Sequence, residues 1–129
     1  MRTAFCLGRE AATVVEEPLD WEDALADAGE LRPPLVERIL AVHGDRGRRG
    51  IEAVTEDRIK EYRDFTVVVG HEDEYVVEGR ACTCRDAMFN LDPSDPTQLC
   101  WHAIAARIAR AVGRVDRHDM WYSDVRDFL

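Results

Sequence analysis

The fold of this chain is decided by residues 82–112, which read CTCRDAMFNLDPSDPTQLCWHAIAARIARAV. Cys82 and Cys84 follow a strand-like run, and side chains two apart along a strand point to the same side, so both thiolates can reach one ion. Fifteen residues later, Cys100 precedes a helix-like segment and His102 falls in its first turn. Residues two apart inside a helix point about 200° apart, so this pair converges only if Cys100 lies outside the helix. The spacing predicts one site built from three thiols and one imidazole.

Three thiolates and one imidazole form the closed set that structural zinc prefers, so we expect Cys82, Cys84, Cys100 and His102 to bind one Zn²⁺. A disulfide is disfavoured in a reducing compartment. A Rieske cluster needs a second histidine in this window, and the motifs of thioredoxin-like sites and zinc deaminases are absent. The remaining alternative is a set of inert thiols without a metal. Four protein ligands leave no position for water, so we expect no catalysis at the metal and no enzyme.

The charge of such a centre also needs partners. Zinc with three thiolates has a local net charge of about −1, for which backbone N–H groups or Arg80 and Arg85 are the expected partners. The N-terminus of the following helix favours the Cys100 thiolate as well.

Apolar periodicity and the positions of glycine and proline predict helices in the N-terminal half. One is expected over 18–28, with Gly29 as the stop, and a second from Pro33-Pro34 to Gly44. The residues of the second helix that are expected to face the core are Leu35, Ile39, Leu40 and Val42. Residues 44–50 are rich in glycine and are interpreted as a turn that carries Arg46, Arg48 and Arg49.

The sequence of the C-terminal half of the chain predicts strands and one clear helix. Residues 65–70 are β-branched and are expected to pair with residues 75–77 in a hairpin turned by residues 71–74. Residues 91–98 contain two prolines and are expected to form a loop. The apolar stripe of the helix over 101–112, which ends at Gly113, consists of Trp101, Ile104, Ala105, Ile108 and Val112. The predicted class is α+β: N-terminal helices, a β-hairpin or small antiparallel sheet, and a C-terminal helix, joined by a structural zinc site.

The composition predicts a single acidic domain. The chain has 129 residues, with 17 Lys and Arg against 26 Asp and Glu, a formal net charge of −9. Lys60 is the only lysine. An acidic surface without lysine is typical of an intracellular protein from molar salt, where screening tolerates self-repulsion; an ordinary acidic protein from a GC-rich genome is the alternative. No signal peptide or membrane anchor is visible, so we expect a cytoplasmic location.

The order of strand, hairpin, Cys-x-Cys, spacer and Cys-x-His opening a helix resembles the SWIM zinc finger over about residues 65–113. Residues 31–54 and the spacer after Cys84 look like the small SWIM subunit of the Shu complex. The resemblance implies three parts: residues 1–64 as the N-terminal helical part of a single domain, 65–113 as the zinc finger, and 114–129 as a C-terminal tail. One departure is Trp101, where that family more often has a polar or basic residue.

That resemblance implies a partner and a function. Its members bind a RecA-like recombinase paralogue and support homologous recombination, and archaeal relatives stand beside RadA paralogues. We therefore expect a non-enzymatic zinc-binding adaptor in DNA repair, without a small-molecule substrate or a membrane partner. The alternative is a stand-alone zinc-finger regulator that binds DNA or protein with no recombinase involved.

Two groups of arginines are candidates for contact with nucleic acid or a partner. Residues 96–115 contain no carboxylate, and the helical spacing of Arg107, Arg110 and Arg114 places them on one face. Arg48 and Arg49 belong to a second group. Guanidinium groups suit phosphates, so these side chains are candidates for DNA contact; the alternative is that they pair with the many carboxylates.

The C-terminal tail alternates apolar and acidic residues. The apolar side chains that could lie in a partner's groove are Met120, Trp121, Val125, Phe128 and Leu129. The alternative is that the tail folds back on its own core. The fourth cysteine, Cys6, is expected to be a small apolar residue of a strand or core.

Overall fold

The computed structural model describes residues 20–126 apart from 71–72, 79–80, 93 and 96. Its elements, in chain order, are α1 (Asp20–Ala28), α2 (Pro33–His43), α3 (Asp45–Thr55), β1 (Ile59–Glu61), β2 (Thr66–Val69), β3 (Glu74–Glu78), β4 (Ala81–Cys82), α4 (Arg85–Phe89), α5 (Trp101–Val112), β5 (Asp116–Arg117) and α6 (Tyr122–Arg126). The predicted α+β class is confirmed. Cys6 and the start of the first expected helix lie outside the described residues.

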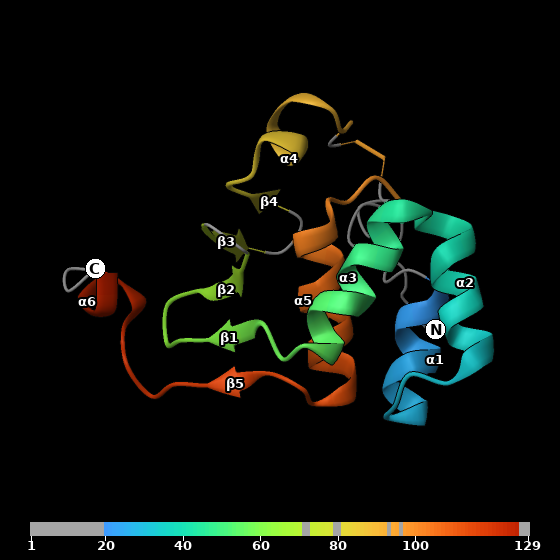
Figure 1. The fold of residues 1–129 in the computed structure, drawn as a ribbon, viewed down its shortest axis with the longest axis horizontal. Helices are drawn as coiled ribbons and strands as arrows, with labels where there is room; N and C mark the ends of the chain where they lie inside the picture. The colour runs from blue at the N-terminus through green and yellow to red at the C-terminus, as the bar shows by residue number, and fades with distance from the viewer. Residues whose placement is uncertain (1–19, 71–72, 79–80, 93, 96, 127–129) are drawn as a thin grey trace, which may run out of the picture.

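Helix α5 is the central element of the molecule. Figure 1 shows it between the helical half, α1 to α3, and the sheet, and it packs on elements of both halves. Seven of its residues are buried, among them Ile104 and Ile108, which are fully covered. Gly113 ends the helix in the left-handed conformation, at φ 73°, as the sequence predicts. The two metal-ligand candidates at its start are therefore fixed to the best-packed helix of the chain.

The sheet is larger than the predicted hairpin. Its five strands lie in the order β4-β3-β2-β1-β5, and the pairs are antiparallel except for the parallel pair β1–β5. The expected pairing of residues 65–70 with 75–77 is observed, with Val67 opposite Val76. Strands β1, β4 and β5 contain only two or three residues each, which is too short for an alternating pattern to be recognised in the sequence.

The predicted turn over residues 44–50 is wrong, because these residues begin helix α3. Gly47 and Gly50 are buried in α3, and each occupies a place where a side chain would collide with a neighbouring helix. A Cβ atom on Gly47 would lie 3.1 Å from Cγ2 of Ile39 in α2. One on Gly50 would lie 3.0 Å from Cγ2 of Ile104 in α5. The glycines therefore permit close helix packing, and only Gly44 acts as a turn residue, at φ 61° between α2 and α3.

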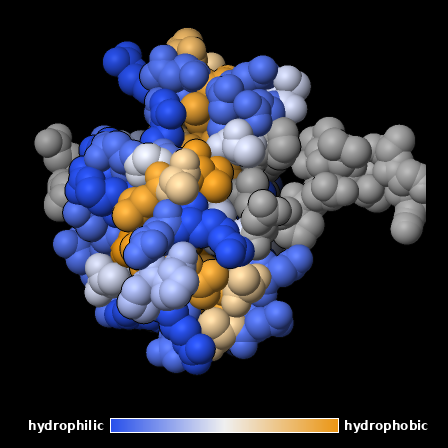
Figure 2. All heavy atoms as spheres, turned by 90° about the vertical axis from the view of Figure 1, so that its right-hand side faces the viewer, coloured by the Kyte–Doolittle hydropathy of each residue, from blue (hydrophilic) through white to orange (hydrophobic). Residues whose placement is uncertain are grey.

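Helix α2 differs from expectation on its outer face. Leu35 and Ile39 are buried as predicted, but Leu40 and Val42 are exposed to 37% and 41%. Figure 2, which views the molecule from the side of α1 and α2, shows apolar side chains among hydrophilic ones on this face. The periodicity of α2 was ambiguous because apolar residues occur on more than one of its faces.

A second, smaller core lies around the strands and the C-terminal segment. Tyr62, Val67 and Tyr122 are buried together, with Phe65 and Val76 packed against them. Tyr122 places α6 on this cluster. This contact favours the interpretation that the C-terminal tail folds back on the protein's own core. Met120 and Trp121 remain about half exposed. The side chains of Val125, Phe128 and Leu129, for which contacts were predicted, are outside the part of the chain that the structure describes. Within the described part of the chain, none of the helices has both the length and the apolar character needed to cross a bilayer.

Candidate metal centre

The four predicted ligands come together at the junction between the sheet and the helical half. Cys82 ends β4, Cys84 is the N-cap of α4, Cys100 is the N-cap of α5, and His102 lies in the first turn of α5. One ligand atom from each of the four residues lies within 4.8 Å of all the others. Ligand atoms arranged tetrahedrally around zinc at bond lengths of 2.0–2.3 Å are about 3.5–4 Å apart, so the cluster has the size that a metal ion requires.

Two of the sulfurs also serve as helix caps. The Ala87 backbone N–H donates to Sγ of Cys84 and the Ala103 N–H donates to Sγ of Cys100, both at 3.4 Å. Such bonds favour the thiolate, because they bring positive N–H dipoles to a negative sulfur at a helix N-terminus. This confirms the expectation that backbone N–H groups accompany the sulfurs.

The imidazole of His102 gives the clearest sign that the cluster fits a metal. Its ring is 4% exposed, and both ring nitrogens are buried without a hydrogen-bond partner within the described residues. A buried polar nitrogen without a partner is costly, of the order of 1–3 kcal/mol. A metal ion among the three sulfurs would use one of these nitrogens as its fourth ligand. The cluster can therefore hold a metal ion, and the donor set favours zinc.

The three thiols influence one another's ionisation. Hydrogen bonds from Cys100 and then Cys82 lower the pKa of Cys84, while the same network, first through Cys82, raises the pKa of Cys100. A divalent cation would replace the protons that these sulfurs share, so metal binding and proton release are coupled at this site.

Comparison with known proteins gives an archaeal relative. A protein of Archaeoglobus fulgidus, described as "Uncharacterized protein", is 39% identical over 112 residues, which cover 87% of this chain and 94% of that protein. This chain belongs to the same family as that archaeal protein. No protein-family model and no solved structure matches the chain.

His102, the candidate histidine ligand, lies between two other aromatic rings. The ring centroid of His102 is 4.1 Å from that of Tyr75 and 3.8 Å from that of Trp101. Arg49 and Arg58 lie over the Trp101 ring, with guanidinium carbons 5.7 and 5.6 Å from its centroid. Trp101 therefore packs on the candidate ligand His102 and on the guanidinium groups of Arg49 and Arg58. Tyr75 was missed by sequence reasoning, since only the fold brings β3 beside α5.

Arg46 was also missed as a residue of this region. It lies in the first turn of α3 and forms a bidentate ion pair with Asp86, with Nε–Oδ2 and Nη2–Oδ1 distances of 2.7 and 2.9 Å. This bond raises the pKa of Arg46, and the negative charges of Cys100 and Cys84 contribute in the same direction. Of the arginines expected near the sulfurs, Arg85 is exposed and Arg80 lies outside the described residues.

The candidate contact arginines point to different parts of the molecule. Arg107 pairs with Glu22 of α1 at 2.8 Å, and Arg114 pairs with Asp57 at 2.9 Å. Arg110 donates to Oγ1 of Thr66 at 2.7 Å and faces Glu61 at 3.8 Å. Each of these three side chains therefore has an acidic or polar partner within the described residues.

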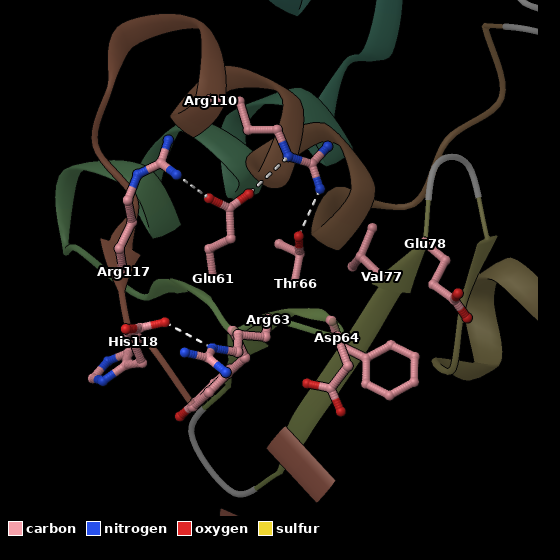
Figure 3. A pocket seen from close by; sticks show the side chains of 12 residues that line it. Glu61, Arg63, Asp64, Thr66, Val77, Glu78, Arg110, Arg117 and His118 are labelled. Atoms are coloured by element: carbon pink, nitrogen blue, oxygen red, sulfur yellow. Dashed lines mark hydrogen bonds and ion pairs between the residues drawn. The ribbon is translucent and has the colours of Figure 1, made fainter. Parts of the chain in front are cut away.

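Arg110 lines a surface groove between the sheet and the end of α5. Figure 3 shows Arg110 and Arg117 directed at Glu61 on one side of this groove of about 690 Å³, with Arg63 and Asp64 on the other. Cations and carboxylates alternate in it, so the groove has no single sign of charge. The second group lies elsewhere: Arg48 pairs with Asp45 and Glu52 along α3, and Arg49 faces Trp101.

Proposed function

We propose that this chain is a non-enzymatic, zinc-binding adaptor of the SWIM type that binds a RecA/RadA-type recombinase paralogue and supports homologous recombination, with DNA as a further contact. The observation that carries the proposal is the Cys₃His cluster at the junction of sheet and helices. The proposal also draws on the sequence resemblance and on the archaeal relative.

The construction of the site supports a structural role for the metal. Cys82 and Cys84 belong to the sheet side, whereas Cys100 and His102 belong to α5. An ion held by all four would cross-link these two parts across a loop of fifteen residues. With four protein ligands the metal has no open position for water, which argues against hydrolysis at the site. Zinc would supply folding free energy, and the chain would supply the binding surface.

Helix α4 supplies a surface suited to a protein partner. Met88 and Phe89, the last two residues of α4, are exposed to 64% and 73%. They are more exposed than the other large apolar side chains of the described residues, and Figure 1 shows α4 at the outer end of the molecule. An exposed aromatic beside a flexible methionine is typical of contact residues at protein interfaces.

Affinity purification from the native cells tests the proposal. The tagged protein is recovered in molar salt, with Met88→Ser/Phe89→Ser compared against Met120→Ser/Trp121→Ser, a matched apolar pair near the C-terminus. We expect a RecA-like ATPase with the wild-type protein and with the Met120/Trp121 variant, and its loss from the Met88/Phe89 variant. Recovery of transcription factors without an ATPase would overturn the adaptor proposal and favour the stand-alone regulator.

A further inference from the structure

The candidate metal centre has a charge that its four ligands do not balance. Three thiolates and a neutral imidazole around a divalent cation leave one net negative charge, and two of the sulfurs belong to buried residues, Cys84 and Cys100. A negative charge that is partly removed from water is costly unless a cation or dipoles compensate it. The Ala87 and Ala103 N–H groups provide two dipoles but no full charge.

Arg46 is a cation that is bonded to the helix beginning at the Cys84 cap. Its partner Asp86 lies two residues after Cys84, in the first turn of the helix that Cys84 caps. Arg46, Asp86 and Trp101 line one small hollow, and Trp101 directly follows Cys100. Arg46 is therefore bonded to the helix that follows Cys84 and lines the same hollow as the residue that follows Cys100. The two-point bond to Asp86 holds the guanidinium there, 41% exposed rather than free in solvent.

We infer that Arg46 is a positioning residue of the metal centre, whose guanidinium compensates the negative charge of the bound metal–thiolate group while Asp86 orients it. This inference rests on the metal-binding part of the proposed function. Arg46, which lies in α3 and forty positions from Asp86 in the sequence, would then help to retain the metal.

The neighbouring arginines do not fill this role. Arg48, two residues further along α3, forms ion pairs with Asp45 and Glu52 on its own helix. Arg49 and Arg58 lie over the outer ring of the stack, on Trp101. Arg107 is held by Glu22. Among the described arginines of this region, Arg46 is the one that forms an ion pair with α4, the helix that begins after the Cys84 cap.

Zinc competition with a chromogenic chelator tests the inference on the full chain. Four proteins are compared at low and at molar KCl: wild type, Arg46→Gln, Arg46→Lys, and Arg48→Gln as the matched control. We expect Arg46→Gln to lower zinc affinity about tenfold in dilute salt, as the loss of an outer contact of a metal site commonly does. Arg46→Lys should restore most of it, and Arg48→Gln should match the wild type. In molar KCl the tenfold difference should shrink to about twofold, because screening replaces the missing cation.

The absorption spectrum of the cobalt-loaded proteins distinguishes a loss of charge compensation from a disrupted metal site. The cobalt-loaded proteins should share the same sulfur-to-cobalt absorption band, which shows that the three sulfur ligands remain in place. If Arg46→Lys loses zinc as readily as Arg46→Gln, or if the difference is unchanged by salt, the charge role is refuted. If the wild-type protein binds no zinc at all, it is the proposed function that fails. Equal affinity of Arg46→Gln and Arg48→Gln, with zinc bound by both, would refute this inference alone.

Discussion

Replacement of Gly50 by valine tests whether α3 packs on α5 as closely as the structure shows. A Cβ at this position would lie 3.0 Å from Cγ2 of Ile104 and 3.2 Å from the backbone nitrogen of Ala105. Ordinary contact between carbon atoms begins near 3.5 Å, so the Cβ alone overlaps by about 0.5 Å, and valine adds two methyl groups. Ile104 can shift its side chain, whereas the Ala105 nitrogen belongs to the backbone of α5.

The magnitude follows from two opposing terms. Valine is a better helix residue than glycine by about 0.4 kcal/mol. Overpacking a buried site costs about 1–3 kcal/mol. We therefore expect Gly50→Val to lower the free energy of unfolding by about 0.6–2.6 kcal/mol. Gly50→Ala should be closer to neutral, because its helix gain of about 1 kcal/mol offsets much of the smaller collision.

Denaturant unfolding of the zinc-loaded proteins, followed by circular dichroism, measures this difference. The control is Glu52→Val, which introduces the same side chain at an exposed position of the same helix. We expect this control to remain within about 1 kcal/mol of the wild type. If Gly50→Val is as stable as Glu52→Val, the close packing of α3 on α5 is refuted.

Three further predictions concern acid, salt and DNA. Burial lowers the pKa of His43, whose Nε2 accepts a hydrogen bond from Nε1 of Trp21 at 3.1 Å, so the unfolded chain binds more protons below pH 6.5. The free energy of unfolding should therefore fall as pH drops from 7 to 5, and His43→Gln should flatten this slope; equal slopes would contradict it. Because the surface is acidic, the melting temperature should rise from dilute to molar KCl, and a flat profile would count against halophily. If Arg107 and Arg110 contact phosphates, their double replacement by alanine should weaken DNA binding in a mobility-shift titration, whereas unchanged binding would leave them as ion-pair residues.

The sequence predicted that these four side chains come together, because each of them was tied to a local signal. Period-2 spacing placed Cys82 and Cys84 on one side of an extended segment, and the apolar stripe placed Cys100 just before α5. These local rules need no knowledge of the tertiary fold. The class of the fold and the end of α5 at Gly113 followed in the same way.

Tertiary contacts account for what the sequence did not reveal. Gly47 and Gly50 look like turn residues, but their lack of a side chain serves packing against Ile39 and Ile104. The strands β1 and β5 are defined by their neighbours and not by a pattern of their own. The bond from Arg46 to Asp86 connects residues forty positions apart, and no periodicity reports such a pair.

We propose that one zinc ion, held by Cys82, Cys84, Cys100 and His102, fixes the two halves of the molecule together. The most direct test of this proposal is the metal content of the purified protein by elemental analysis, with the fold followed by circular dichroism before and after chelation. Cys100→Ala is measured beside Cys6→Ala, the cysteine outside the motif. We expect one zinc per chain in the wild type and in Cys6→Ala, no zinc and loss of cooperative unfolding in Cys100→Ala, and recovery of the wild-type fold when zinc is returned after chelation. A Cys100→Ala protein that folds cooperatively without metal would contradict the account.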